Sequence, residues 1–183
     1  TLLLGQDVWR ATLGIIGFGR IGQALARRGR GFEMKILYHD VRRYPEAEAE
    51  LDAEYCELET LLQRSDFISI HTSLTPQTAG LIGTDAFNQM KANAVLVNTA
   101  RGPIVDAEAL YTALSTRRIF AAALDVTDPE PLPANSKLLE LPNLIVVPHI
   151  ASATVSSRTN MAMIAARNLV AGVQGLPLPH AVN

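Results

Sequence analysis

Three polar side chains, Arg101, Glu130 and His149, each follow an apolar run that is typical of a buried strand. An arginine offers a rigid fork of donors to a carboxylate, and a histidine can give or take a proton near neutral pH. A glutamate beside that histidine would fix its tautomer and keep it a competent acid. Alone, each could equally be an ordinary loop residue. Together they could reduce a 2-keto acid: Arg101 would bind the carboxylate and polarise the ketone, and His149 would protonate the alkoxide while a nicotinamide supplies hydride.

A glycine-rich turn follows the strand that ends at Ile16 and leads into a predicted helix. In such a turn Gly17 permits a tight bend, Gly19 lets a pyrophosphate approach the backbone, and Gly22 lets the helix pack close to the strand. The amides at the start of that helix, with its dipole, form an anion site. Glycine-rich turns are common, but the position between strand and helix predicts a dinucleotide site.

Asp40 follows the second predicted strand, roughly 20 residues after the turn, where a carboxylate reaches the adenosine ribose hydroxyls. A surface aspartate is the alternative interpretation. Arg42 and Arg43 lie close by, and an arginine there can bind a 2′-phosphate instead. Because an acid at the strand end repels that phosphate, the sequence favours NAD, with NADP as the alternative.

Strand and helix patterns alternate along the chain, which predicts an α/β fold with a doubly wound parallel (Rossmann) sheet and right-handed crossovers. We expect a single dinucleotide-binding domain over residues 1–183. Prolines predict that residues 126–135 are irregular. The further strands are expected at residues 34–38, 54–56, 67–70, 94–98, 120–124 and 144–147. The helices are expected to be one closed by Gly29 and Gly31, then residues 45–51, 57–64, 85–90, 106–116 and 154–173.

The composition is that of an ordinary globular protein, with 48% hydrophobic and 19% charged residues among 183. A net charge of −2 gives no field for holding nucleic acid, and no apolar run reaches the roughly 18 residues that span a bilayer. Cys56 is the only cysteine in the sequence, which fits a cytoplasmic protein without a disulfide or a cysteine metal site. The chain does not begin with methionine, and we expect it to be part of a longer protein.

Four segments carry a family resemblance: residues 17–22 (GFGRIG), 98–102 (NTARG), 124–132 (beginning LDV and ending EPL) and 148–154 (PHIASAT). In order and spacing they resemble the D-isomer-specific 2-hydroxyacid dehydrogenases, and the resemblance covers essentially the whole chain. The run from Glu130 to Pro133, the pair Leu138 and Leu139, and the Ser-Ala-Thr after His149 are most similar to the glyoxylate/hydroxypyruvate reductase branch.

The resemblance implies a role for each matching position. Arg101 would bind the substrate and act in catalysis, and Glu130 and His149 would be the acid–base pair. Asp40 would hold the ribose, and Asp125 would contact the nicotinamide carboxamide. The other cofactor contacts that it implies are Gly17, Gly19, Arg20, Ile21, Gly22, Ser73, Thr99, Ala100, Arg101, His149, Ala151 and Ser152.

The sequence also departs from the family. Ala151 stands where glycine is usual, and Ser73 stands where many members have proline, although the reductase branch tolerates serine there. The family has a substrate domain built from preceding residues and the C-terminal tail, here about residues 174–183. Because the preceding part is absent, we expect this chain to bind NAD but to turn over poorly or not at all. An apolar patch around Met161 and Met163 should then be exposed.

The activity implied by the resemblance is reduction of a small 2-keto acid of the glyoxylate or hydroxypyruvate type to a D-2-hydroxy acid, in a homodimer. A 3-phosphoglycerate or other D-2-hydroxyacid dehydrogenase is an alternative. So is a non-catalytic NAD-sensing interaction module, since corepressor relatives of the family share the fold. Such sensors can keep Arg101, Glu130 and His149, so these residues favour an enzyme without deciding the question. An unrelated domain, such as a methyltransferase, would require the loop matches to be accidental.

Overall fold

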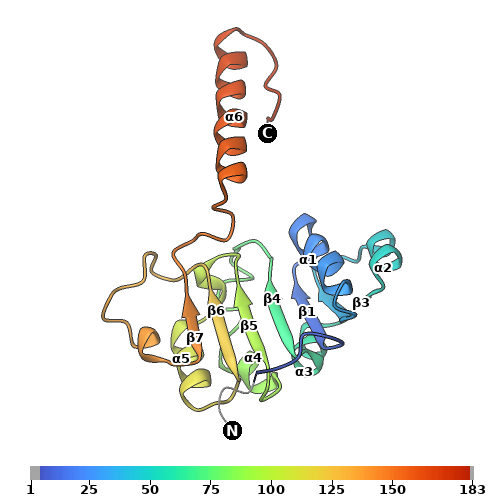
Figure 1. Ribbon diagram of the computed structural model, residues 1–183, viewed down its shortest axis with the longest axis vertical. Helices are drawn as coiled ribbons and strands as arrows, with labels where there is room; N and C mark the ends of the chain where they lie inside the picture. The colour runs from blue at the N-terminus through green and yellow to red at the C-terminus, as the bar shows by residue number, and fades with distance from the viewer. Residues whose placement is uncertain (1–4, 182–183) are drawn as a thin grey trace. The chain divides into compact units, whose positions relative to one another are not determined.

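The computed structural model describes residues 5–181 of the chain. The chain divides into two compact units, one ending at Pro148 and the other beginning at His149. The first unit is built on one parallel sheet of seven strands in the order β3-β2-β1-β4-β5-β6-β7 (Figure 1). The strands are β1 (Thr12–Ile16), β2 (Lys35–His39), β3 (Ala53–Tyr55), β4 (Phe67–Ile70), β5 (Val95–Asn98), β6 (Ala121–Leu124) and β7 (Leu144–Val146).

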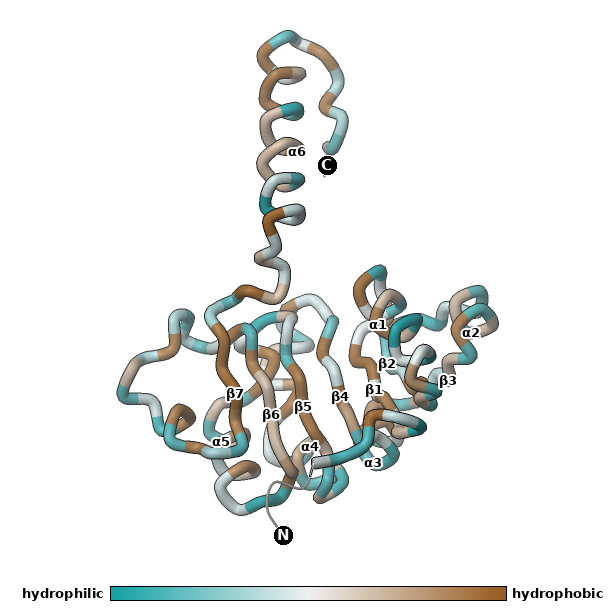
Figure 2. Tube along the Cα trace, in the orientation of Figure 1, coloured by the Kyte–Doolittle hydropathy of each residue, from teal (hydrophilic) through white to brown (hydrophobic). Residues whose placement is uncertain are grey.

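Around β1 both faces of the sheet bury apolar side chains, because successive residues of a strand point to opposite faces. In β5 to β7 one face is less covered, since Val97 is half-buried and Ile145 is exposed. In β1, Leu13 and Ile15 join a core with Ala26 of α1, whereas Ile16 joins the core that contains Leu61 of α3. Helices α1 and α2 contribute to the first core, and α3, α4 and α5 contribute to the second. Figure 2 shows the hydrophobic strands between these helices. The helices are α1 (Arg20–Arg30), α2 (Pro45–Leu51), α3 (Leu58–Arg64), α4 (Thr84–Gln89) and α5 (Ala107–Ser115), with 3-10 turns η1 (Gly102–Ile104) and η2 (Lys137–Glu140).

The register of the sheet aligns the carboxyl ends of its strands. Ile16 of β1 pairs with Ile70 of β4, which pairs with Asn98 of β5. Asn98 pairs with Leu124 of β6, and Leu124 pairs with Val146 of β7. The loops that follow these strands therefore begin at the same rim. The strand order reverses between β1 and β4, which is the point where open α/β sheets bind ligands.

The second unit contains one helix, α6 (Val155–Val173), within the part of the chain that the structure describes. The Thr154 side chain caps it by accepting a hydrogen bond from the Ser157 amide at 3.1 Å. In this unit Met161 and Met163 are exposed, as the sequence predicts. What packs against them, and whether residues 174–183 return to a further domain, stay predictions.

The predicted strands and helices are all present, with ends shifted by a residue or two. One expectation is wrong: Gly29 does not close α1, which continues to Arg30 and ends at Gly31. Gly29 lies inside the helix. A Cβ there would lie 3.0 Å from side-chain atoms of Leu13 and Ile36, so its absence lets the helix approach the sheet closely. Residues 126–135 are irregular, as expected. None of the described helices is long and apolar enough to span a bilayer, and the described residues contain no cluster of metal-binding side chains.

Candidate cofactor and active site

The turn between β1 and α1 can be formed only by glycine at Gly17. Its φ is +93°, a conformation that L side chains rarely adopt. A Cβ there would also lie 2.5 Å from the Thr72 amide nitrogen in the loop after β4. Gly17 therefore lets the turn pass tightly over the neighbouring strand end.

The start of α1 is an uncapped helix N-terminus. Gly19 is the N-cap residue, no side chain caps the helix, and the first turn holds no acid. The first amides of a helix lack partners within it, and its dipole favours an anion there. A Cβ on Gly19 would meet nothing within 4 Å, whereas one on Gly22 would lie 2.2 Å from the Gly17 oxygen. Gly22 thus allows close packing inside the protein, and Gly19 leaves open space outside it.

Asp40 lies beside this turn, because its predecessor His39 pairs with Ile16 at the ends of β2 and β1. Its carboxylate accepts hydrogen bonds from the amides of Phe18 at 2.6 Å and of Val41 at 2.7 Å. The carboxylate is thus attached to the glycine turn itself. Its role in binding the ribose stays a prediction.

A buried amide shapes the loop that carries Arg101. Asn98 is fully buried at the end of β5. Its Nδ2 donates to the Arg101 carbonyl at 2.9 Å, and its Oδ1 accepts from the Ala100 amide at 3.0 Å. Its backbone carbonyl accepts from the Asp125 amide at 2.9 Å. Sequence reasoning placed Asn98 in a strand and a motif but missed this positioning role.

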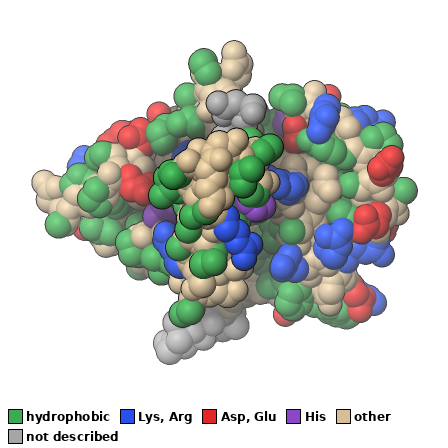
Figure 3. All heavy atoms as spheres, turned by 90° about the horizontal axis from the view of Figure 1, so that it is seen from above, with side chains coloured by type: hydrophobic (Ala, Val, Ile, Leu, Met, Phe, Trp, Pro, Cys, Tyr) green, Lys and Arg blue, Asp and Glu red, His purple; other side chains and the backbone are tan. Residues whose placement is uncertain are grey.

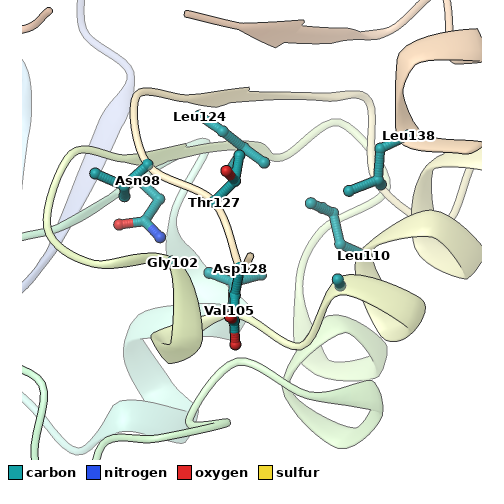
Figure 4. Close-up of a pocket in the computed structure, with 10 residues that line it drawn as sticks. Asn98, Gly102, Val105, Leu110, Leu124, Thr127, Asp128 and Leu138 are labelled. Carbon is teal, nitrogen blue, oxygen red and sulfur yellow. The ribbon is translucent and has the colours of Figure 1, made fainter. Parts of the chain in front are cut away.

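The Arg101 loop is pressed against the loop after β6. A Cβ on Gly102 would lie 2.0 Å from the Thr127 carbonyl oxygen and 2.8 Å from the Asp128 nitrogen, so only glycine allows this approach. Figure 4 shows Asn98, Gly102, Thr127 and Asp128 around the small cavity between the two loops. At about 10 Å³ this cavity holds at most one water. The close packing fixes the Arg101 loop relative to the segment that leads to Glu130.

The remaining predicted residues of the first unit lie in the loops at the same rim, except Arg20 and Ile21, which form the start of α1. Arg101 is exposed, and its guanidinium donates to the Ala100 carbonyl at 2.6 Å. Glu130 is exposed in the irregular segment after β6, whereas Asp125 is buried immediately after that strand. The others differ in exposure: Ala100 is buried, Thr99 is half-buried, and Arg20, Ile21 and Ser73 are exposed.

His149 directly follows Pro148, three residues after the end of β7 at Val146, and it is the first residue of the second unit. Its φ is +54°, a left-handed conformation that is uncommon outside glycine and is concentrated at functional sites. Ala151 and Ser152 are exposed in the same unit. The apposition of His149 with Arg101 and Glu130 stays a prediction.

Two other reactive groups are accounted for by the fold. Burial lowers the pKa of His71, whose Nε2 lies 2.8 Å from the Ser69 hydroxyl, so this histidine is a neutral hydrogen-bonding partner. Burial also raises the pKa of the Cys56 thiol, which keeps it protonated and unreactive.

A parallel sheet with its switch point beside a glycine turn, an uncapped helix start and a strand-end aspartate defines a dinucleotide-binding domain of the Rossmann class. The family described as D-isomer specific 2-hydroxyacid dehydrogenase, NAD binding domain, matches residues 1–151. The chain belongs to this family.

Curated relatives include a glyoxylate/hydroxypyruvate reductase B of Escherichia fergusonii, 50% identical over 172 residues, and a glyoxylate reductase of Thermococcus litoralis, 50% identical over 182. These matches cover 93% and 100% of this chain but only 53% and 55% of the relatives, so the chain spans about half their length. Among solved structures, the TT0316 protein of Thermus thermophilus matches with a TM-score of 0.93 at 46% identity, over 100% of this chain and 57% of that one. D-lactate dehydrogenase of Lactobacillus jensenii with NAD+ matches with a TM-score of 0.90 at 36% identity, over 98% of this chain and 58% of that one.

Proposed function

We propose that this chain is the cofactor-binding and catalytic-residue domain of an NAD(P)H-dependent reductase. Its substrate would be a small 2-keto acid of the glyoxylate or hydroxypyruvate type, and its product a D-2-hydroxy acid. The observation that carries this proposal is the register that starts the loops after β1, β4, β5, β6 and β7 at one rim. That rim brings the glycine turn and the Arg101 loop to the switch point of the sheet. The names of the curated relatives support the same activity.

The cofactor would be held by groups that the fold already presents. The amides of Arg20 and Ile21 at the start of α1 would bind the pyrophosphate, and Asp40 would accept the ribose hydroxyls. Gly17 and Gly22 keep the turn in shape, and Gly19 leaves the approach open. The nicotinamide end would lie along the loops after β4, β5 and β6, and the bound nicotinamide supplies hydride. Further contacts would come from Ser73, Thr99, Ala100, Asp125, Ala151 and Ser152.

The chemistry assigned to the protein side chains needs three groups. Arg101 would bind the substrate carboxylate with its fork of donors and polarise the ketone. His149 would donate the proton that the product alkoxide takes up, and Glu130 would orient the imidazole and stabilise its charged form. The Asn98 hydrogen bonds and the Gly102 contact hold the backbone of the Arg101 loop in place before substrate binds.

The experiment separates binding from turnover. NADH is titrated onto the 183-residue chain, and turnover is measured on the full-length gene product with glyoxylate, hydroxypyruvate, 3-phosphohydroxypyruvate and 2-ketoisocaproate. We expect NADH to bind the chain, and His149→Gln to lower kcat by about 100-fold or more, as loss of a general acid does. His180→Gln, in the same unit, is the matched control and should retain activity. Turnover with none of the four acids would favour an NAD-sensing module, and robust turnover by the isolated chain would show that no further domain is required.

The surroundings of the reaction are proposed on the same basis. One buried cysteine fits a cytoplasmic protein, and a net charge of −2 favours no nucleic acid partner, nor is a membrane partner expected. With this net charge, a small anionic substrate must be held by local groups such as Arg101. A homodimer is expected from the family resemblance. NAD is favoured over NADP because Asp40 presents an acid at the end of β2.

A further inference from the structure

A carboxylate on α2 is held in place by two groups. Glu48 has a side chain that is only 14% exposed. The Tyr38 hydroxyl donates to its Oε1 at 2.5 Å, and the Arg43 guanidinium donates to both of its oxygens, at 3.1 and 2.5 Å. The Tyr44 amide donates to the Tyr38 oxygen at 2.9 Å, which orients that hydroxyl. Arg43 and then Tyr38 lower the pKa of Glu48 to about 2, so the carboxylate is charged at any ordinary pH.

The anchor of this carboxylate belongs to the same core as the glycine turn. Tyr38 is fully buried, and its ring stacks on Phe18, the residue between Gly17 and Gly19, with centroids 3.9 Å apart. Burial and the Glu48 carboxylate raise the pKa of Tyr38 to about 12, so it remains a donor. Glu48 is therefore fixed relative to the cofactor turn instead of moving with solvent.

Arg43 lies in the loop that begins with Asp40, and it lines a cleft of about 430 Å³ together with Arg42 and Glu46. The Arg42 guanidinium lies over the Tyr44 ring, 4.7 Å from its centroid. Figure 3 shows basic and acidic side chains mixed on the side of the first unit that carries α1 and α2. A phosphate on the adenosine ribose would need cations of this loop, since Asp40 at the strand end repels it.

Glu48 takes the fork of Arg43 that its Nε and Nη2 donors form, and it neutralises the guanidinium charge. The same pair of parallel hydrogen bonds could bind a phosphate, so a second anion would meet only the remaining Nη1 side of a guanidinium whose charge is already compensated. If a 2′-phosphate took this fork, the Glu48 carboxylate would keep the Tyr38 hydroxyl but lose its charged partner, which is unfavourable for a side chain that is only 14% exposed. We propose that Glu48 is a cofactor-selecting residue that masks Arg43 and thereby favours NADH over NADPH. This inference rests on the proposed function.

The test compares the affinities for NADH and NADPH at one ionic strength, followed by nicotinamide fluorescence. Glu48→Gln frees the fork of Arg43 and is expected to raise NADPH affinity about tenfold or more, with NADH affinity nearly unchanged. Glu46→Gln is the matched control, because it removes one negative charge from the same helix, on the cleft that Arg43 lines, without a change at Arg43. An equal gain in NADPH affinity for Glu46→Gln would mean that overall charge is responsible, which would overturn the proposal.

Arg43→Leu supplies a second arm. In the native chain it should change NADPH affinity little, because the fork is already occupied, whereas in the Glu48→Gln background it should abolish the gain. A loss of NADPH affinity from Arg43→Leu alone would show that Arg43 already serves the phosphate and would refute masking. Masking would also be refuted if NADH binds normally and Glu48→Gln leaves the ratio of NADH affinity to NADPH affinity unchanged. If neither cofactor binds the native chain, the proposed function itself fails, and this inference with it.

Discussion

Two glycines of the same turn should respond in opposite ways to the same added methyl group. Gly19→Ala places its Cβ in open space in the free protein, with nothing within 4 Å, at a position with φ of −69°. Alanine restricts the unfolded chain, which stabilises by about 0.4–1 kcal/mol, but it is a poorer N-cap than glycine by a similar amount. The free energy of unfolding should therefore change by no more than about 0.5 kcal/mol.

The cost of Gly19→Ala appears only when cofactor binds. Its Cβ would occupy the space through which a pyrophosphate is proposed to approach the amides at the start of α1. Loss of one charge-assisted hydrogen bond is worth about 1.5–3 kcal/mol, so NADH should bind about 10- to 100-fold more weakly. Gly22→Ala is the internal comparison. Its Cβ would lie 2.2 Å from the Gly17 oxygen, where 3.0 Å is about the shortest contact seen, so the backbone must move by about 0.8 Å.

Overpacking of that kind costs about 1–3 kcal/mol, partly offset by the helix propensity of alanine, and Gly22→Ala should unfold at lower urea concentration. The free energy of unfolding of each variant is measured by urea denaturation, and its NADH affinity is measured by titration without urea. Weaker NADH binding without a stability loss in Gly19→Ala, and a stability loss in Gly22→Ala, are the expected results. Unchanged NADH affinity in Gly19→Ala would refute the assignment of this turn as the pyrophosphate site.

Two further predictions follow from the packing of the first unit. Gly102→Ala must move the Arg101 loop by about 1 Å away from the Thr127 oxygen, which should lower kcat of the full-length gene product by about 100-fold while NADH affinity changes less. Gly83→Ala, whose Cβ would make only a 3.5 Å contact, is the control. Equal losses of kcat in both variants would contradict the argument. The pKa of Glu48 is lowered to about 2 in the fold, so its carboxylate stabilises the native state above pH 4.5, and this contribution disappears as pH falls from 4.5 towards 2. Urea unfolding should show the advantage of the native chain over Glu48→Gln shrinking below pH 4.5, and an advantage that grows there would show the sign to be wrong.

Much of the fold could be predicted from sequence because its signals are local. The apolar runs predict the strands, and Asp106 predicts the start of α5, where its carboxylate accepts from the Ala109 amide. The glycine turn was predictable for the same reason, since Gly17 has a positive φ and Gly22 packs against the Gly17 oxygen five residues before it. Gly29 shows where this reasoning fails, because a glycine in a helix can mark close packing as well as a helix end.

Some residues of the candidate site could be predicted from the sequence, and others could not. Arg101, Glu130 and Asp40 could be proposed from residue type and from their place after predicted strands. The amide network of Asn98 and the masking of Arg43 by Glu48 could not, because nothing in the local pattern distinguishes these residues from other strand-end or helix-surface residues.

The sequence by itself determined which segments become strands, helices and turns, and which polar residues follow the strands, since these depend on hydrophobic period and on glycine and proline chemistry. Only the tertiary structure decided the register that aligns five strand ends, the contact of Gly102 with Thr127 and the attachment of Asp40 to the glycine turn. The physical reason is that these contacts join residues far apart along the chain, and their distances are set by packing across the sheet.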